Sequence, residues 1–430
     1  MQRLARRAVV ALVAAGAAAP AGAQTNFAVY VSLGDGLTAG VSNGSLVEGH
    51  QRRSFPALIA RQAGATAFEQ PLVSDPGIPA ELALVTLIPP VVAAKAATPG
   101  GPLRGNLTRA YNNLGVPTAT VSDLLTRVTD GGGFHDLVLR GAGTALAQGM
   151  GLKPTVVTLW TGVSDILPAV VSGQAFEGKT MTPLATFRAA FQSVVSAVKA
   201  SGAFAVAANV PDVTSIPYAT TIQPIVVNPA TGAPVRVNGA TVPLIGPEGP
   251  LPASTLVTLA ASPLLLRGDG IPAALGGTGQ PLPNEVILGP TEQTAIRDRI
   301  GQYNQAIAEI CQAASIPVLD ANAYFAGVAA GGRVVGGITL SNAFLSGGLF
   351  GFDGVHPTDL GYALLANEWI RFINSRGGQL AEVDLGPYLG VAGTASAQAS
   401  VRAGGAAPWT AFTAEAYDSL RAMFPPVSKR

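Results

Sequence analysis

The sequence of 430 residues contains little cysteine, histidine or charge. Cys311 is its one cysteine, so neither an intrachain disulfide nor a cysteine-based metal site can form. The three histidines, His50, His135 and His356, are far apart and lack the spacing typical of zinc ligands, so we expect no metal and no other cofactor. Charged residues make up 12% of the chain, its net charge is +1 and it has no basic run, so nucleic acid is not an expected partner.

The N-terminal segment has no apolar run long enough to cross a membrane. Three arginines precede a short apolar stretch, residues 8–19, and a small-x-small pattern ends at Ala23. This order is typical of a secretory signal peptide with its cleavage site. A transmembrane anchor is the less favoured alternative, because about a dozen residues are too few for a bilayer that needs roughly 20. We therefore expect residues 1–23 to be a cleaved signal peptide and the mature protein to be secreted or periplasmic.

Apolar runs alternate with helical patterns along much of the chain, and this order is typical of a parallel α/β sheet. Residues 154–160 are the strongest predicted strand, because their centre, Val-Val-Thr-Leu, is apolar and mostly β-branched. The predicted strands are residues 27–33, 111–117, 154–160, 204–210 and 316–319. The predicted helices are residues 56–63, 121–128, 183–201, 291–314 and 357–375. The sequence therefore predicts a doubly wound α/β sandwich.

Two stretches rich in proline and glycine, about 73–105 and 217–290, interrupt this alternation. The second contains short β-like runs on either side of a turn at residues 228–232. They are predicted to be insertions that wall a pocket, or alternatively loosely ordered surface extensions. We expect one domain with these insertions over residues 24–376, followed by a C-terminal extension over residues 377–430.

Asp353 and His356 stand in a short turn, Asp-Gly-Val-His-Pro, directly before the last predicted helix. An acid three residues before a histidine can contact the imidazole, orient its tautomer and stabilise the imidazolium. In an open parallel sheet, sites form outside the carboxyl ends of the strands, and this turn can face that crevice. The pair is therefore a candidate catalytic acid and base. The alternative is a capping aspartate beside a surface histidine.

Two segments at opposite ends of the predicted domain resemble sequence blocks of the GDSL, or SGNH, hydrolases. Residues 31–40, Val-Ser-Leu-Gly-Asp-Gly-Leu-Thr-Ala-Gly, resemble the Gly-Asp-Ser-Leu signature, but Gly36 stands where that family has its serine. Residues 353–362, Asp-Gly-Val-His-Pro-Thr-Asp-Leu-Gly-Tyr, match the family's fifth block in full.

Two segments between them resemble the second and third blocks. Residues 113–124 carry Thr118 where a glycine normally follows the proline. Residues 159–165 carry Ser164 in place of the asparagine of Gly-x-Asn-Asp. The four motifs occur in the family's order and, with the strands between them, cover most of residues 27–376. The chain is therefore identified as a divergent member of this family.

The resemblance implies a flavodoxin-like, three-layer α/β/α sandwich with a five-stranded parallel sheet. It also implies hydrolysis of a small-molecule acyl ester, a lipid or an acylated glycan. In the family the serine attacks, the histidine takes its proton and the aspartate supports the histidine. Two backbone amides and the asparagine hold the oxyanion. Carried onto this chain, His356 and Asp353 keep their roles, Gly36 occupies the nucleophile position, and Gly36, Thr118 and Ser164 occupy the oxyanion-hole positions.

The three departures from the family pattern therefore lie at the nucleophile and oxyanion-hole positions, where the reaction takes place. Loss of a serine-protease nucleophile costs about 10⁶ in kcat, and loss of one oxyanion donor costs about 10² to 10³. The hydroxyls of Ser32, Thr38 and Ser42 are not expected to replace the serine, whereas a water activated by His356 can bypass it. The sequence leaves open an esterase with weak, unorthodox or lost activity, a pseudoenzyme that binds an acyl or glycan ligand, and a scaffold without a ligand.

Overall fold

The computed structural model of the protein describes residues 25–87, 90–228, 231–389, 411–413, 416 and 423. The predicted signal peptide, residues 1–23, and most of the predicted C-terminal extension lie outside the described residues. None of the helices in the described ranges combines the length and the apolar character that a membrane crossing requires.

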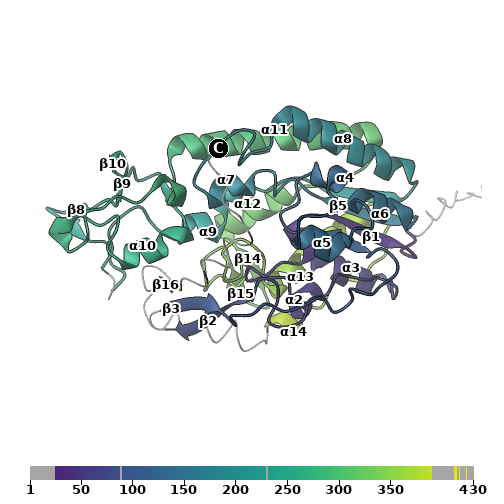
Figure 1. Ribbon diagram of the computed structural model, residues 1–430, viewed down its shortest axis with the longest axis horizontal. Coiled ribbons are helices and arrows are strands. Elements are labelled where there is room, and N and C mark those ends of the chain that lie inside the picture. Colours follow the sequence, from purple (N-terminus) through teal and green to yellow (C-terminus); the bar gives the residue numbers. More distant parts are fainter. Residues whose placement is uncertain are drawn as a thin grey trace, which may run out of the picture.

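The core of the fold is a parallel sheet of five strands in the order β13-β6-β5-β1-β4 (Figure 1). Strands β1 and β5 are buried along their whole length, as expected for a sheet that helices cover on both faces. Ser32 on β1 lies opposite Thr158 on β5, and their hydroxyl oxygens are 2.8 Å apart. Ser32 is thus part of the sheet core. The strands are β1 (Tyr30–Gly34), β4 (Asn113–Gly115), β5 (Val156–Trp160), β6 (Phe204–Ala208) and β13 (Val318–Leu319).

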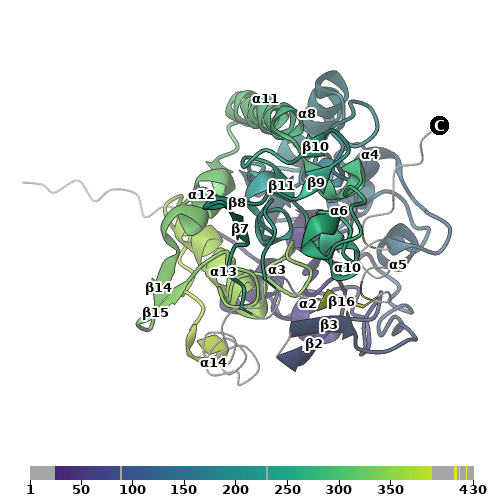
Figure 2. The ribbon, with the colours of Figure 1, turned by 90° about the vertical axis from the view of Figure 1, so that its left-hand side faces the viewer.

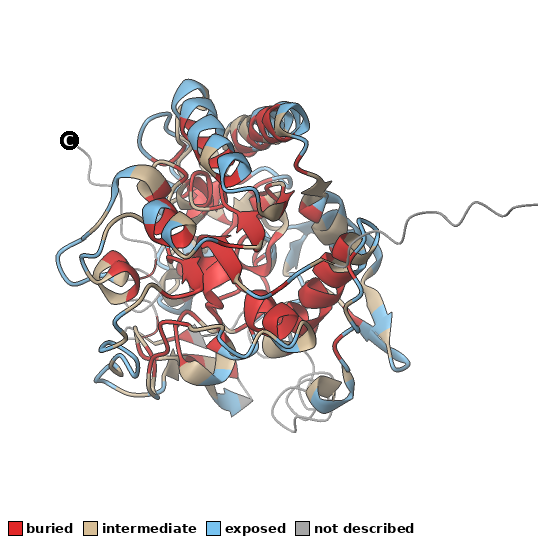
Figure 3. Cartoon of the chain, turned by 90° about the vertical axis from the view of Figure 1, so that its right-hand side faces the viewer, coloured by how far each residue is buried: buried red, intermediate tan, exposed pale blue. Residues whose placement is uncertain are grey.

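Helices form a layer on each side of this sheet. Figure 1 shows α8 and α11 on one side and α3 and α13 on the other, and Figure 3 shows the buried layer between them. The rings of Phe187 and Tyr303 stack between α8 and α11, with centroids 4.0 Å apart. The predicted three-layer α/β/α sandwich with a five-stranded parallel sheet is confirmed. The main helices are α3 (Phe55–Gln62), α4 (Asp123–Thr126), α6 (Ala145–Gly151), α8 (Leu184–Ala200), α11 (Pro290–Ala314) and α13 (Asp359–Asn374).

Several elements have no counterpart in the sequence prediction. The longest is α12 (Ala321–Gly331), which begins where the side chain of Asp320 accepts the N–H of Ala323. Its residues are almost all small or apolar, so no polar face marks it as an amphipathic helix. The other such elements include α1 (Gly36–Ala39), α2 (Glu48–Gln51), α5 (Phe134–Leu139), α7 (Leu167–Val171), β14 (Arg333–Val335), β15 (Ile338–Leu340) and α14 (Gly386–Leu389).

The two predicted insertions form small sheets outside the central one. The first holds the antiparallel pair β2 (Leu82–Leu87) and β3 (Pro90–Ala94), and β16 (Ala411–Phe412) pairs in parallel with β3. Figures 1 and 2 show the second insertion at one end of the molecule, beyond the central sheet. Its elements are 3-10 turn η1 (Val213–Ser215) just before it, then α9 (Pro217–Thr220), β7 (Arg236–Val237), β8 (Ala240–Thr241), β9 (Ile245–Gly246), β10 (Gly249–Pro250), β11 (Leu256–Val257), η2 (Leu259–Ala261), α10 (Ser262–Leu266), η3 (Ala273–Leu275), η4 (Asn284–Val286) and β12 (Ile287–Leu288).

Candidate active site

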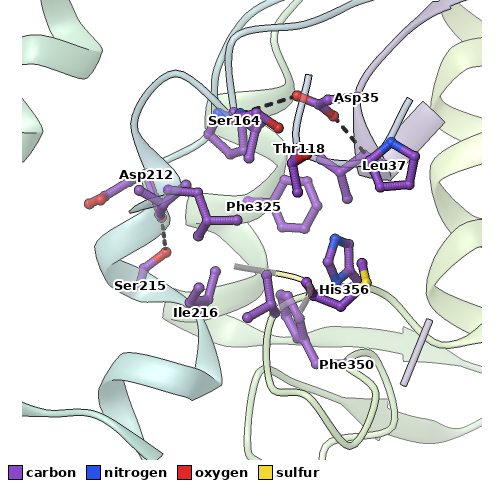
Figure 4. A pocket seen from close by; sticks show the side chains of 18 residues that line it. Asp35, Leu37, Thr118, Ser164, Asp212, Ser215, Ile216, Phe325, Phe350 and His356 are labelled. Atoms are coloured by element: carbon purple, nitrogen blue, oxygen red, sulfur yellow. Dashed lines mark hydrogen bonds between the residues drawn. The ribbon is translucent and has the colours of Figure 1, made fainter. Parts of the chain in front are cut away.

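The residues singled out from the sequence meet at the carboxyl edge of the central sheet. β1 ends at Gly34 and α1 begins at Gly36, while Thr118 follows β4 and Ser164 follows β5. Because β1 lies between β4 and β5, the turns after these parallel strands are neighbours. Gly36, Thr118, Ser164 and His356 all line one pocket with a cavity volume of about 40 Å³ (Figure 4). The fold therefore brings together segments that are far apart in the sequence.

Asp353 lies behind His356 and is fully buried. Its Oδ2 is 2.8 Å from Nδ1 of His356 and accepts the N–H of Gly44 at 2.8 Å. Its Oδ1 accepts the N–H groups of Val355 and His356, each at 2.9 Å. Burial acts to raise the pKa of Asp353, but the charge of His356 and these hydrogen bonds outweigh it and hold the pKa below its ordinary value. As a carboxylate, Asp353 accepts the Nδ1 proton, and Nε2 is then the nitrogen directed at Gly36.

Gly36 lies where the pocket meets the imidazole of His356. A Cβ atom on Gly36 would lie 3.0 Å from His356 Nε2 and 3.6 Å from Val41 Cγ2. The φ of Gly36 is not positive, so the backbone conformation does not require glycine here. The imidazole sets the limit, and a serine at this position would require His356 to move by a few tenths of an ångström.

Thr118 has a left-handed backbone, with φ of 67°. A β-branched residue is rare in this conformation, which costs roughly 1–2 kcal/mol, whereas glycine adopts it without strain. The backbone at Thr118 therefore has a form that suits the glycine of the family's second block. The exposed threonine side chain lines the pocket in place of a bare backbone.

Ser164 has its backbone N–H engaged with Asp35. That N–H donates to Oδ2 of Asp35 at 3.3 Å, while Oδ1 of Asp35 accepts the N–H of Leu37 at 3.2 Å (Figure 4). Ser164 itself lines the pocket, but its side chain is shorter than the asparagine that the family carries there. Oxyanion binding by Ser164 thus depends on its hydroxyl group.

Comparison with known proteins decides the family. Residues 30–369 match the family model for GDSL-like lipase/acylhydrolase. The chain belongs to this family. The matched range contains the strands of the central sheet and all five residues predicted for the site. No curated protein matches the chain.

Three solved structures are similar to this chain at low sequence identity. A putative lipolytic protein of the G-D-S-L family from Desulfitobacterium hafniense DCB-2 has 14% identity and a TM-score of 0.33, covering 80% of this chain and 97% of its own. A lipase/acylhydrolase from Enterococcus faecalis has 14% identity and a TM-score of 0.34, covering 83% and 98%. The acetyl xylan esterase AlAXEase has 12% identity and a TM-score of 0.31, covering 80% and 98%. The family assignment rests on the sequence match and not on these likenesses.

This GDSL family member has two buried acids near the pocket that the sequence analysis does not single out. Burial raises the pKa of Asp35 to about 6, although the N–H groups of Ser164 and Leu37 oppose the shift. Burial also raises the pKa of Asp165 to about 7, although the N–H of Val121 donates to it at 2.9 Å. The charge beside the pocket therefore changes near neutral pH. The sequence signal for both acids is their position inside the first and third family blocks.

The remainder of the pocket wall is mostly apolar, with Asp212 and Ser215 as polar members, and it comes from other segments than expected. Ile216 follows β6, Phe325 lies on α12, Phe350 precedes the Asp353 turn, and Met423 belongs to the C-terminal extension. No described residue of the two insertions lines this pocket, so the prediction that they wall it is wrong for the cavity at Gly36.

The insertions instead pack behind the turn that carries Asp353 and His356. At the start of the second insertion, the N–H of Tyr218 donates to the carbonyl of Gly354 at 2.8 Å. In the first insertion, the side chain of Leu82 lies against Gly44, where an added Cβ would be 3.4 Å from its Cδ1. Gly44 in turn donates its N–H to Asp353. Both insertions therefore support the acid–base pair from outside the cavity.

Proposed function

We propose that this member of the GDSL-like lipase/acylhydrolase family is an exported acyl esterase in which His356 activates a water molecule in place of the missing serine. The observation that carries the proposal is the buried Asp353–His356 pair, whose Nε2 is directed at Gly36 beside the pocket. A cavity needs roughly 10–15 Å³ to hold a water. The volume of about 40 Å³ thus has space for a water and a small acyl group.

The chemistry follows from the groups around that space. Within the described part of the chain, the N–H groups of Gly36 and Thr118 donate no hydrogen bond, so they can hold the carbonyl oxygen of an ester. His356 takes a proton from the water as its oxygen attacks the carbonyl carbon, and Asp353 stabilises the imidazolium. The tetrahedral intermediate then breaks its bond to the alcohol, which takes the proton from His356. The products are a carboxylic acid and an alcohol, with no acyl-enzyme between.

The activity is expected to be slow. General base catalysis contributes about 10² to 10⁴ to the rate, and the two retained backbone donors act with it. The substrates we propose are small acyl esters, lipids or acylated glycans. Export is supported by the arginine-rich, apolar and small-residue order of residues 1–23. N-terminal sequencing of the exported protein should find a start near Gln24.

The decisive test compares the wild type with His356→Ala on p-nitrophenyl acetate. We expect kcat/KM to fall by about 10² to 10⁴, because the general base is lost. His135→Ala is the matched control, because His135 is also buried and its Nδ1 lies 3.0 Å from Asp130, outside the pocket. Equal rates for the wild type and His356→Ala would refute the proposal. Pre-steady-state kinetics should show no burst of p-nitrophenol.

A binding protein without turnover is the second candidate. Two observations favour it: the Thr118 side chain lines the pocket, and the N–H of Ser164 is engaged with Asp35. Calorimetric titration with an ester, followed by product analysis, separates the two functions. Binding without acid or alcohol release would identify a pseudoenzyme. A protein that neither binds nor cleaves would be a scaffold.

A further inference from the structure

Met423 lines the candidate active site although it lies far beyond the residues that match the family. It is 1% exposed and shares the pocket with Gly36 and His356. The family match ends at residue 369, so this contact belongs to the chain's own C-terminal extension.

Met423 fills an apolar hollow that opens beside Gly36. It belongs to a buried apolar cluster with Ala39, Val41, Leu46 and Val73, against which Ile78, Phe134 and Leu137 pack. Val41 reaches the site directly, because its Cγ2 lies 3.6 Å from the position of a Cβ on Gly36. This cluster gives the hollow an apolar side that suits an alkyl chain.

Residues 411–413 of the extension also contact the body of the protein. Ala411 and Phe412 pair with Val91 and Val92 of β3, and the N–H of Thr413 donates to the carbonyl of Val92 at 3.1 Å. Phe412 is 4% exposed and stacks on Phe344, with ring centroids 6.2 Å apart. Met423 is thus the second buried anchor of this segment.

We propose that Met423 is a specificity-determining residue that occupies an alkyl subsite next to Gly36 and His356 and restricts the site to short acyl groups. The inference deepens the proposed function and rests on it. The methionine side chain is unbranched and has the shape of a short alkyl chain. With it in place, the cavity of about 40 Å³ holds an acetyl-sized group. An alanine at this position would free the space of Cγ, Sδ and Cε, which is about three methylene groups.

The test measures binding, so that it does not depend on turnover. Methyl ketones have the carbonyl of an ester but cannot be hydrolysed, and 2-butanone to 2-heptanone add one methylene at a time. Burial of a methylene strengthens binding about 4-fold. In the full-length Met423→Ala variant we expect about 4-fold tighter binding for each of three added methylenes, roughly 60-fold in all. In the wild type the affinity should not rise with chain length.

Two control variants isolate the position of the side chain. Met423→Leu keeps an apolar side chain of similar volume and should bind like the wild type. Met181→Ala removes the same side chain from another buried site, 5% exposed and outside the pocket, and should also leave chain-length selectivity unchanged. Thermal denaturation of each variant checks that it is folded. An unchanged chain-length response in folded Met423→Ala, or no ketone binding to it, overturns the inference.

A measurement on the wild type covers the case in which Met423→Ala does not fold. With methionine methyl groups labelled with ¹³C, 2-butanone should shift the signal of Met423 and leave those of Met150 and Met181 in place. A bound ketone that leaves the Met423 signal unchanged overturns the inference. If chain-length selectivity changes as expected but no ester is cleaved, only the proposed hydrolysis fails. If acetyl esters are cleaved but Met423→Ala gains nothing, only the present inference fails.

Discussion

Two histidines, the buried His356 and the half-buried His50, flank the start of α13 and differ in the carboxylates that their ring nitrogens contact. His356 has Asp353 at Nδ1, and its Nε2 is directed at the pocket by Gly36. His50 has a carboxylate at each nitrogen: Nδ1 lies 2.6 Å from Asp359 and Nε2 lies 2.7 Å from Glu81. The two imidazoles thus lie near the same helix end but have different partners at their ring nitrogens.

The difference shows how the surroundings of a histidine set its role. Burial alone would lower the pKa of His50, but the hydrogen bonds and charges of Asp359 and Glu81 outweigh it and raise the pKa to about 9. His50 is therefore a cation at neutral pH that joins the first insertion to α13, and it cannot accept a proton. His356 has the Asp353 carboxylate at Nδ1 and its Nε2 directed at Gly36 beside a cavity, which is the arrangement of a general base.

The largest effect is expected when Asp353 loses its carboxylate, and the same change at Asp359, beside His50, is the matched control. Asp353→Asn should lower kcat/KM for p-nitrophenyl acetate by as much as His356 contributes, about 10² to 10⁴, because the amide cannot orient and stabilise the imidazolium. Asp359→Asn should leave kcat/KM within about twofold of the wild type, because His50 takes no part in the reaction. Steady-state kinetics measure both. A similar loss in the two variants would remove the distinction between the histidines.

The next largest effect is expected from restoring the serine hydroxyl, from which the histidine takes a proton in the family. Gly36→Ser supplies the missing hydroxyl, and we expect a gain of about 10³ in kcat, with a burst and a covalent acyl-enzyme. A full gain of about 10⁶ is not expected, because Ser164 still replaces an oxyanion donor worth about 10² to 10³. The new Cβ would lie only 3.0 Å from Nε2 of His356, and this close approach also limits the gain in kcat.

Gly36→Ala is the control for this substitution, since it adds the same Cβ without the hydroxyl. Mass spectrometry after reaction with a fluorophosphonate should find an adduct on Gly36→Ser alone. A folded Gly36→Ser protein with no adduct and no gain in rate would show that His356 does not act as a base toward this position.

The smallest expected effect is on stability and concerns His50. Because its pKa is about 9 in the folded protein against 6.5 ordinarily, the folded state holds the proton more tightly. Protonated His50 therefore stabilises the folded state by roughly 3 kcal/mol. This contribution to the free energy of unfolding is fully present below pH 6.5 and is lost as the pH rises through 9. Urea unfolding of the wild type should show this decline, and His50→Gln should lack it. A decline of equal size in His50→Gln would contradict the role given to His50.

Local sequence patterns predicted the fold because the central elements carry strong signals. The β-branched run of β5 and the long helical period of α11 appear in the structure close to their predicted ranges. Helix α12 was not predicted, because its small and apolar residues have no polar face and its burial depends on distant neighbours. The family was predicted from four short motifs in order, and the match over residues 30–369 confirms it.

Residues of the candidate site were predicted only where they stand in those motifs. Gly36, Thr118, Ser164, Asp353 and His356 were all named from the sequence, and the structure places them together. Their catalytic roles stay predictions. The sequence also named the insertions as walls of the pocket, which was wrong for this cavity, because loop composition does not say which side of a turn a loop packs against.

By itself, the sequence determined the order of the five central strands and of most of the long helices, the family and the absence of a side chain at Gly36, since each of these depends on adjacent residues. Tertiary structure alone decided that His50 meets Asp359, 309 positions away, and that Met423 enters the pocket. Such contacts depend on packing and charge between segments that are far apart in the sequence, so neither segment has a sequence pattern that predicts them. The missing serine is therefore a fact of the sequence, but the room left around it is a property of the fold.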